Sequence, residues 1–462
     1  MKPADAMQRN LRTMRVFSVP AGHVKPSWRS PVLLAIVLLA LSPALFAQES
    51  KSEGEKEQVR TTSAMSEKVY RKLAEAQELA EAEKFTEAKA LLDNFDMEKL
   101  SPYEKAQVYN FYGFIYYSQE RYNDSIRAYE NVLRQPDIPD GLRDQTRYTI
   151  AQLYFTTEQW QKAIDLIEQW LKTAQNPGPD PYVLLASAYY QLEKWPKMIP
   201  PLEKAMDIAR QRDTDIKEQW WLLLRVAYFE QKDFKKVTEI LETLVSHWPK
   251  KEYWTQLSAM YGELGQEKRQ LAAYWAAYDQ GLLDRSNELV QLAQLFLQAD
   301  VPYKAGLVLE KGLKAELVEK TADNYRLLSQ AWALAAEDQK AVPALKMAAS
   351  MSADGDLDVR LAQSYLNLSR YDECIQAARE GLRKGGVKRE DSARIVLGMC
   401  LYENKKYEDA KKAFMAAARD KRSERTARQW VQFIEREEER LRQLDNALKR
   451  ARQGRTKTAQ VQ

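Results

Sequence analysis

Large apolar residues recur at helical spacing along the chain from about residue 67 onward. In the clearest segment, Tyr109, Tyr112 and Tyr116 are followed by Tyr122 and Tyr129. Spacings of three and four residues place such side chains on one face of an α-helix. The segment therefore predicts two successive amphipathic helices.

The same pattern returns along most of the chain. The units begin near residues 69, 106, 144, 179, 218, 251, 286, 322, 355 and 391, in steps of 33–39 residues. One helix pair cannot bury its own apolar face, so neighbouring pairs must stack. The chain has only 16 glycines and 17 prolines, too few for the frequent turns of an all-β fold. We predict an all-α solenoid of about ten helix pairs.

Small residues occupy the places where the two helices of a unit would cross. They are Gly113, Ala151, Ala186, Ala293, Ala362 and Gly398 in first helices, and Ser125, Ala163, Ala305, Ala341 and Ala410 in second helices. With the aromatic positions, they resemble the tetratricopeptide-repeat (TPR) family, whose unit is a helix pair of 34 residues. The resemblance implies a right-handed superhelix that binds other proteins. Arg225 and Gln270 are large where the family has small residues, so we expect the fifth and sixth units to be distorted or shifted in register.

The first 47 residues have the composition of a signal peptide. A basic stretch ending at Arg29 precedes the apolar run 31–41, and residues 44–47 offer a cleavage site. The run is short for a membrane helix, which needs about 20 residues, although an uncleaved anchor is the alternative. Residues 48–66 are polar and predict a disordered spacer. We therefore expect export to the periplasm.

The repeats are expected to span residues 67–418 and to end under a capping helix. Trp430, Ile434 and Leu441 follow one stripe of an Arg/Glu-rich segment, which predicts a cap over residues 419–453 that ends before Gly454. Residues 454–462 then form a basic tail. Membrane contact is expected only through basic residues near this end, namely Arg450, Arg452, Arg455 and Lys457. A solvated tail is the alternative.

Charge and residue inventory exclude several classes of function. The whole chain has a formal net charge of +4, but residues 48–462 hold 64 basic and 65 acidic residues, which disfavours capture of nucleic acid. The chain has two histidines, His23 in the leader and His247 at a unit end. No phosphate-binding glycine loop, zinc motif or nucleophile motif occurs. We expect no catalytic residues, no metal and no cofactor, and hence no enzyme.

The two cysteines fall on neighbouring helices of the predicted stack. Cys374 begins the second helix of the ninth unit, and Cys400 lies in the first helix of the tenth. In the oxidising periplasm a disulfide would join the last two units. Two buried free thiols are the alternative, because spacing alone does not fix the side-chain directions.

The TPR resemblance also implies which positions bind a partner. In that family the second, fifth, ninth, twelfth and thirteenth positions of each unit line a groove. Carried over, the groove residues are aromatic rings interleaved with amides: Asn110, Phe114, Tyr117, Tyr148, Gln152, Phe155, Tyr190 and Phe229. Arg326 is the one basic residue at such a position, which disfavours clamping of a chain-terminal carboxylate. The alternative is that these rings pack between repeats.

These features predict a periplasmic scaffold that binds a peptide segment or a subunit of an envelope complex. The layout of signal peptide, charged spacer, repeats and basic helical end resembles the TPR proteins that accompany TonB-ExbB-ExbD systems. That resemblance implies a role in the uptake of iron or other nutrients. An assembly factor for outer-membrane or cell-wall machinery is the alternative, and self-association into a homo-oligomer is compatible with both.

Overall fold

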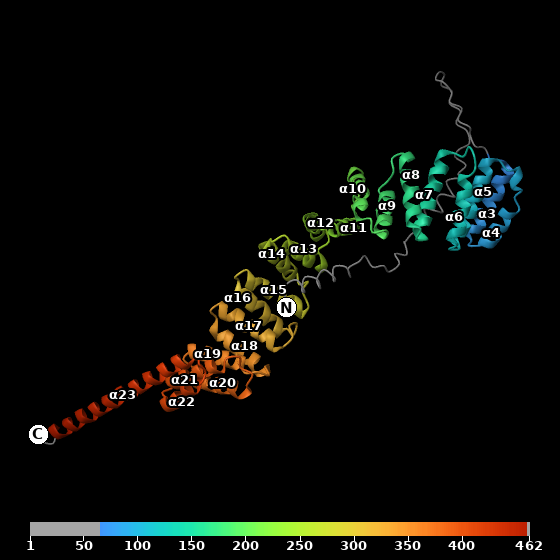
Figure 1. Cartoon of the computed structure of the whole chain (residues 1–462). Helices are drawn as coiled ribbons and strands as arrows, with labels where there is room; N and C mark the ends of the chain where they lie inside the picture. The colour runs from blue at the N-terminus through green and yellow to red at the C-terminus, as the bar shows by residue number, and fades with distance from the viewer. Residues whose placement is uncertain (1–64, 460–462) are drawn as a thin grey trace. The chain divides into compact units, whose positions relative to one another are not determined.

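The computed structural model describes residues 65–459, with side chains for residues 65–450. Apart from one short 3-10 turn, η2 (Met97–Lys99), every regular element in this range is an α-helix (Figure 1). The predicted signal peptide and residues 48–64 of the predicted spacer lie outside the described residues. Between residues 65 and 459, no helix has both the length and the apolar character that crossing a membrane requires.

The chain forms two compact units, divided between Trp248 and Pro249. Unit 1 contains five helix pairs. They are α3 (Glu67–Glu81) with α4 (Phe85–Asp93), α5 (Pro102–Ser118) with α6 (Tyr122–Leu133), α7 (Asp140–Thr156) with α8 (Trp160–Thr173), α9 (Asp180–Gln191) with α10 (Trp195–Gln211), and α11 (Glu218–Glu230) with α12 (Phe234–His247).

Unit 2 contains five further pairs and a long last helix. They are α13 (Lys251–Glu263) with α14 (Glu267–Asp279), α15 (Ser286–Gln298) with α16 (Pro302–Lys314), α17 (Ala322–Leu334) with α18 (Asp338–Met351), α19 (Asp356–Asn367) with α20 (Tyr371–Lys384), α21 (Glu390–Glu403) with α22 (Tyr407–Ala417), and α23 (Glu424–Ala459). The first helices of all ten pairs begin within four residues of the predicted unit starts.

The helices of a pair cross where the sequence places small residues, as predicted. In the second pair, the Ser125 hydroxyl donates to the Gly113 carbonyl oxygen over 2.7 Å. A Cβ atom at Gly113 would lie 2.6 Å from the Tyr129 ring. The last pair repeats this arrangement, because a Cβ at Gly398 would lie 2.7 Å from the Phe414 ring. Both glycines therefore allow a large ring of the second helix to lie against the first helix.

The first helix of each pair ends in the same hydrogen-bonded turn. One residue adopts a left-handed conformation, and the next N–H group donates back across six residues, as in a Schellman motif. In the eighth pair, Ala336 has φ 58° and the Glu337 N–H donates to the Trp332 carbonyl oxygen. The acceptor, Trp332, is also the large buried residue of this first helix. The same residue therefore holds both the turn and the core packing of the pair.

Successive pairs of unit 1 are tied by phenol–carboxylate hydrogen bonds. The Tyr154 hydroxyl donates to Glu130 of the preceding pair over 2.8 Å, and the Tyr228 hydroxyl donates to Glu203 over 3.1 Å. Burial, together with the adjacent carboxylate, raises the pKa of Tyr154 and of Tyr228 to about 12. Both phenols therefore remain protonated donors at neutral pH.

The first helices of the fifth and sixth pairs begin at the predicted unit starts, residues 218 and 251, so the expected shift in register is wrong. In the sixth pair the Ser258 hydroxyl donates to the Gln270 carbonyl oxygen over 2.8 Å, which reproduces the crossing contact of the second pair. The bulk of the Gln270 side chain is accommodated by Gly262, where a Cβ would lie 2.8 Å from the Gln270 amide nitrogen. One small residue thus compensates for the loss of another. Arg225 lies half-buried in a regular α11.

The helix α23 covers the last pair, but it begins at Glu424 and ends at Ala459, so it lies five to six residues further along the chain than the predicted 419–453. Trp430 stacks on Phe414 with ring centroids 5.3 Å apart, and Ile434 is fully buried. The helix continues through Gly454 to Ala459 instead of ending before the glycine. A single glycine costs a helix only about 1 kcal/mol relative to alanine, which is not enough to end it.

Candidate protein-binding face

Six of the eight predicted groove residues lie partly exposed on the first helices of unit 1. Tyr117, Phe155, Tyr190 and Phe229 occupy equivalent places on α5, α7, α9 and α11, and each is half-buried. Helices α9 and α11 contact each other directly. We call Tyr117, Tyr148, Gln152, Phe155, Tyr190 and Phe229 the first-helix face.

The rings of this face are held by aromatic residues five positions further along the chain. Phe155 meets Trp160 edge-on, with ring centroids 4.8 Å apart, and Tyr190 meets Trp195 edge-on at 5.6 Å. The same pairing joins Tyr117 to Tyr122 and Phe229 to Phe234. Each ring therefore packs on the start of its own second helix, inside its repeat, and keeps only part of its surface exposed.

Two predicted groove residues do not belong to an exposed face. Asn110 is 4% exposed and Phe114 is 7% exposed. Phe114 packs in a core cluster with Leu73 and Leu92 of the first pair. The resemblance to the family assigned both positions to the groove, but here the preceding pair covers Phe114. We therefore exclude Asn110 and Phe114 from the binding face.

Tyr148 and Gln152 lie one turn apart on α7. The Tyr148 ring stacks on Trp170 of α8, with centroids 4.9 Å apart. Burial raises the pKa of the Tyr148 phenol, the charge of Asp180 adds to the effect, and the hydrogen bond with the Gln152 side chain opposes it. The Trp170 indole nitrogen is buried without a hydrogen-bond partner among the described residues.

Two carboxylates lie near rings of the first-helix face. Asp180 is close enough to Tyr148 to raise its pKa. Burial also raises the pKa of Tyr190, and Glu230 of the next pair adds to this shift. An anionic partner group would be repelled here, which agrees with the argument against carboxylate clamping.

In unit 2, the positions that correspond to these rings are Gly262, Leu297, Ala333, Leu366 and Tyr402, of which only Tyr402 is aromatic. Gln294, Gln330 and Gln363 are exposed at the ninth positions. Arg326 is exposed and pairs with Asp323 over 2.9 Å on its own helix. Tyr402 packs on Tyr407 with ring centroids 5.7 Å apart, as the rings of unit 1 pack on their second helices, but a row of such rings on successive repeats occurs only in unit 1 among the described residues.

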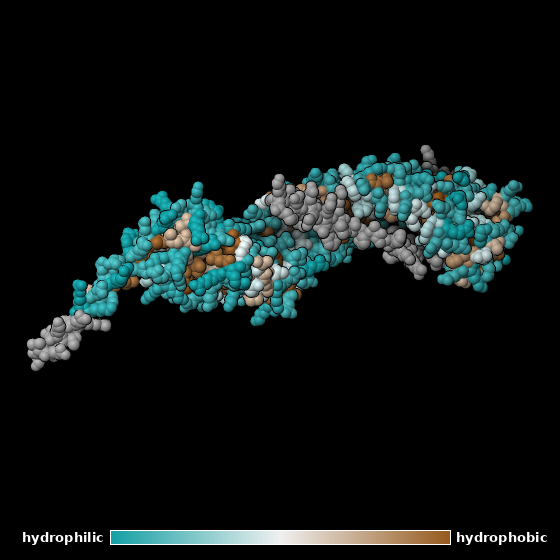
Figure 2. Space-filling model, turned by 60° about the horizontal axis from the view of Figure 1, so that its bottom comes forward, coloured by the Kyte–Doolittle hydropathy of each residue, from teal (hydrophilic) through white to brown (hydrophobic). Residues whose placement is uncertain are grey.

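A group of exposed apolar residues on unit 2 escaped the sequence analysis. Trp275, Tyr303 and Leu307 are 39%, 45% and 45% exposed on the second helices α14 and α16. In Figure 2 the face drawn is mostly hydrophilic, with hydrophobic residues gathered over part of the C-terminal repeats. Trp275 and Tyr303 are not among these brown residues, because the Kyte–Doolittle scale ranks tryptophan and tyrosine as hydrophilic. Helical periodicity does not separate an apolar residue that is buried from one that is exposed, so it gave no reason to single out these three residues.

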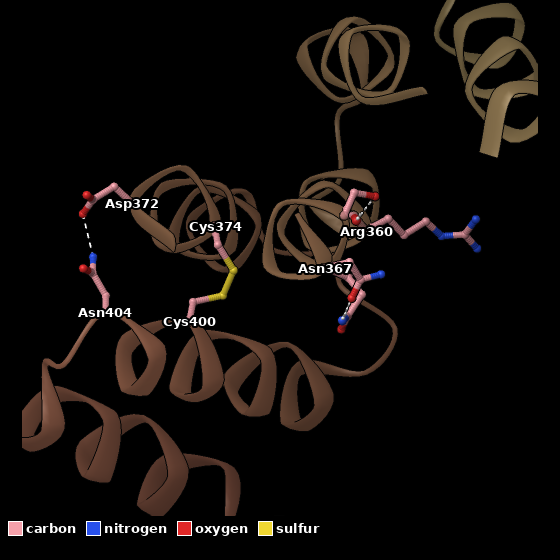
Figure 3. The surroundings of a disulfide bond; sticks show 8 residues. Arg360, Asn367, Asp372, Cys374, Cys400 and Asn404 are labelled. Carbon is pink, nitrogen blue, oxygen red and sulfur yellow. Dashed lines mark hydrogen bonds between the residues drawn. A yellow bond between two sulfur atoms is a disulfide. The ribbon is translucent and has the colours of Figure 1, made fainter. Parts of the chain in front are cut away.

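Cys374 and Cys400 are joined by a disulfide bond between α20 and α21 (Figure 3). Their Cα atoms are 5.8 Å apart, within the range that a disulfide bridge requires. Both residues are fully buried. Beside the bridge, the Asn404 side-chain amide donates to Asp372 over 2.7 Å, so a polar contact at the surface joins the same two pairs.

His247 is the one histidine among the described residues. His247 is exposed at the end of α12, where its Nδ1 lies 2.9 Å from the Thr243 carbonyl oxygen. Among the described residues, no group of three His, Cys, Asp or Glu side chains is arranged to hold a metal ion.

No protein-family model and no curated protein matches this sequence. Solved structures do resemble it. The MamA protein is 19% identical, with 36% of this chain and 87% of that chain covered and a TM-score of 0.31. YrrB, described as a TPR protein with an unusual peptide-binding site, is 16% identical, with 42% and 91% covered and a TM-score of 0.32. A tetratricopeptide repeat protein from Parabacteroides merdae is 14% identical, with 62% and 94% covered and a TM-score of 0.34.

The repeats of the chain itself define its class. The ten described helix pairs share a large anchor in the first helix and the same left-handed turn, and most have small residues at their crossings. The described residues form an all-α array of TPR-like helix pairs, in agreement with the predicted fold class.

Proposed function

We propose that this protein is a scaffold that binds a segment of another protein on the first-helix face of unit 1. The observation that carries the proposal is the row of half-buried rings at equivalent places on α5, α7, α9 and α11, with Gln152 beside them. Rings that are already packed on their repeat lose little conformational freedom when a partner covers them. Amide side chains can bond a peptide backbone without selecting its sequence.

The chemistry of the face favours an apolar or basic segment. Phe155, Tyr190 and Phe229 offer apolar area at intervals set by the repeat, so a partner must present several apolar side chains in a row. Asp180 lies near Tyr148 and Glu230 near Tyr190, and both carboxylates would favour a segment with lysine or arginine between the apolar residues.

The test adds bulk and charge to the face while leaving its rings in place. The variant Gln152→Arg/Thr156→Arg/Gln191→Arg changes three residues on α7 and α9. The matched control, Asn123→Arg/Gln169→Arg/Ser246→Arg, adds the same charge to exposed positions of the second helices α6, α8 and α12. Tagged proteins are crosslinked in cells, and captured proteins are identified by mass spectrometry.

We expect the face variant to capture at least tenfold less of the partner than the unmodified protein, while the control captures the same amount. Circular dichroism and thermal unfolding of both variants check that each remains folded. Equal capture by a folded face variant and the control would refute the assignment of this face.

The same capture experiment tests the finer proposal of a periplasmic role with a TonB system. That proposal is supported by the export signal in the sequence and by the resemblance in layout. Capture of TonB or ExbB-type proteins, lost in the face variant, supports a role in energy transduction and nutrient uptake. Capture of porins or wall synthases instead supports the alternative of an assembly factor.

A further inference from the structure

Unit 2 carries an apolar patch on the side of its second helices. We define the second-helix patch as Trp275, Tyr303 and Leu307, which are 39%, 45% and 45% exposed. Tyr303 and Leu307 are four residues apart on α16 and so share one helix face. Singly exposed apolar residues are ordinary on a surface, whereas a connected group marks a contact site.

Contacts between neighbouring pairs connect the patch. Lys304 of α16 holds its Nζ 3.4 Å from the centre of the Trp275 ring on α14. Lys340 of α18 holds its Nζ 5.3 Å from the centre of the Tyr303 ring on α16. The two rings also meet first-helix rings edge-on, Trp275 on Phe296 and Tyr303 on Trp332. Three consecutive second helices are therefore joined through ring and lysine contacts.

The patch is both apolar and cationic. Helix α16 contains three lysines (Lys304, Lys311 and Lys314) and one acidic residue, Glu310. Lys311 and Lys314 are exposed. A lysine over the face of an aromatic ring is held by the ring's quadrupole, so the positive charge stays next to the apolar surface and does not move freely in solvent.

We propose that the second-helix patch is a second docking site, which binds an acidic amphipathic helix of a partner protein. Leucines or aromatic residues on one stripe of that helix would cover Tyr303 and Leu307. Acidic residues beside the stripe would pair with Lys304 and Lys311, whereas Lys340 already pairs with Glu337 over 3.5 Å. The partner chemistry is opposite to that favoured by the first-helix face of unit 1, so the two sites select different segments.

The experiment uses two designed helical peptides with the same leucine stripe, one flanked by glutamates and one by lysines. Binding to the full protein is measured by fluorescence anisotropy, and hydrogen exchange locates the protected helices. We expect the acidic peptide to bind at least tenfold more tightly than the basic one and to protect α14, α16 and α18. Its affinity should fall as salt is raised.

A matched pair of variants ties binding to the patch. Leu307→Glu places a carboxylate in the patch, whereas Leu317→Glu makes the same change at an equally exposed leucine (45% for each) between α16 and α17. We expect at least a tenfold loss for Leu307→Glu and less than a twofold change for Leu317→Glu. The proposal is overturned by equal binding of the two peptides, by equal effects of the two variants, or by protection confined to unit 1.

Discussion

At the residue scale, the turn between the two helices of each pair depends on one residue in the left-handed conformation. In the sixth pair this residue is Gly265, with φ 67°. In the other pairs it carries a side chain, for example Glu120 in the second pair and Lys405 in the tenth. A left-handed conformation costs a residue with a Cβ about 1–2 kcal/mol. Nine pairs therefore contain this strain, and the sixth pair avoids it through Gly265.

Replacing Gly265 by alanine isolates the cost of this conformation. No atom lies within 4 Å of the position that a Cβ would take at Gly265, so the change adds backbone strain without a clash. We expect Gly265→Ala to lower the free energy of unfolding of unit 2 by about 1 kcal/mol, measured by urea denaturation.

The control for this prediction is Gly141→Ala at the start of α7. It also has no atom within 4 Å of the added Cβ, and its φ is not left-handed. In a helix, alanine is more favourable than glycine by up to about 1 kcal/mol, so this variant should be neutral or stabilising. Equal destabilisation by the two substitutions would contradict the role assigned to the Gly265 backbone.

The same turns show where sequence reasoning stops at this scale. Glycine is the usual signal for a left-handed residue, but here Glu120, Ala336 and Lys405 occupy the position. The turn forms because its hydrogen bonds outweigh the strain of the left-handed residue. No single residue type occurs at this position, so the sequence does not predict the turn. Small residues such as Gly113 and Ser125 were predictable, because only they fit where two helices cross.

At the element scale, the helix pairs could be predicted from the sequence. Which of their side chains remain exposed could be predicted only in part. The spacing of apolar residues predicted where every first helix begins, since the apolar stripe of a helix must be buried whichever helix covers it. It did not show that Phe155 packs on Trp160 and Tyr190 on Trp195, because both members of each pair fit the periodic pattern separately. Burial of Phe114 depends on the preceding pair, which a position-by-position comparison with the family does not include.

The disulfide joins two elements, α20 and α21, and its removal should act locally. Closing a loop of this length is worth about 3 kcal/mol, and the bridge spans 26 residues. We expect Cys374→Ala/Cys400→Ala, or reduction of the native protein, to increase hydrogen exchange in α20 to α22. Helices of unit 1 serve as the internal control and should not change.

Thiol titration provides the second arm of this test. The denatured, unreduced protein should contain no free thiol if the bridge forms in the cell. Two free thiols, or exchange in α20 to α22 that is equal with and without the cysteines, would contradict a stabilising bridge.

At the scale of the whole molecule, the chain combines two surfaces of different chemistry on one kind of repeat. Unit 1 presents rings flanked by Asp180 and Glu230 on its first helices. Unit 2 presents Trp275, Tyr303 and Leu307 beside lysines on its second helices. A scaffold with these surfaces can bind two different segments, since their charge preferences are opposite. The sequence predicted the first surface through family positions, whereas the second depends on which apolar residues the repeats leave uncovered.

The most direct test of the central claim places a photoreactive phenylalanine analogue at single positions in the cell. Gln191 lies beside Tyr190 on the first helix α9, and Gln169 is exposed on the second helix α8. We predict that the analogue at Gln191 crosslinks one defined protein, and that the analogue at Gln169 does not. Crosslinking of the same protein at Gln169 but not at Gln191 would contradict the account, because the partner would then bind the opposite side of the repeats.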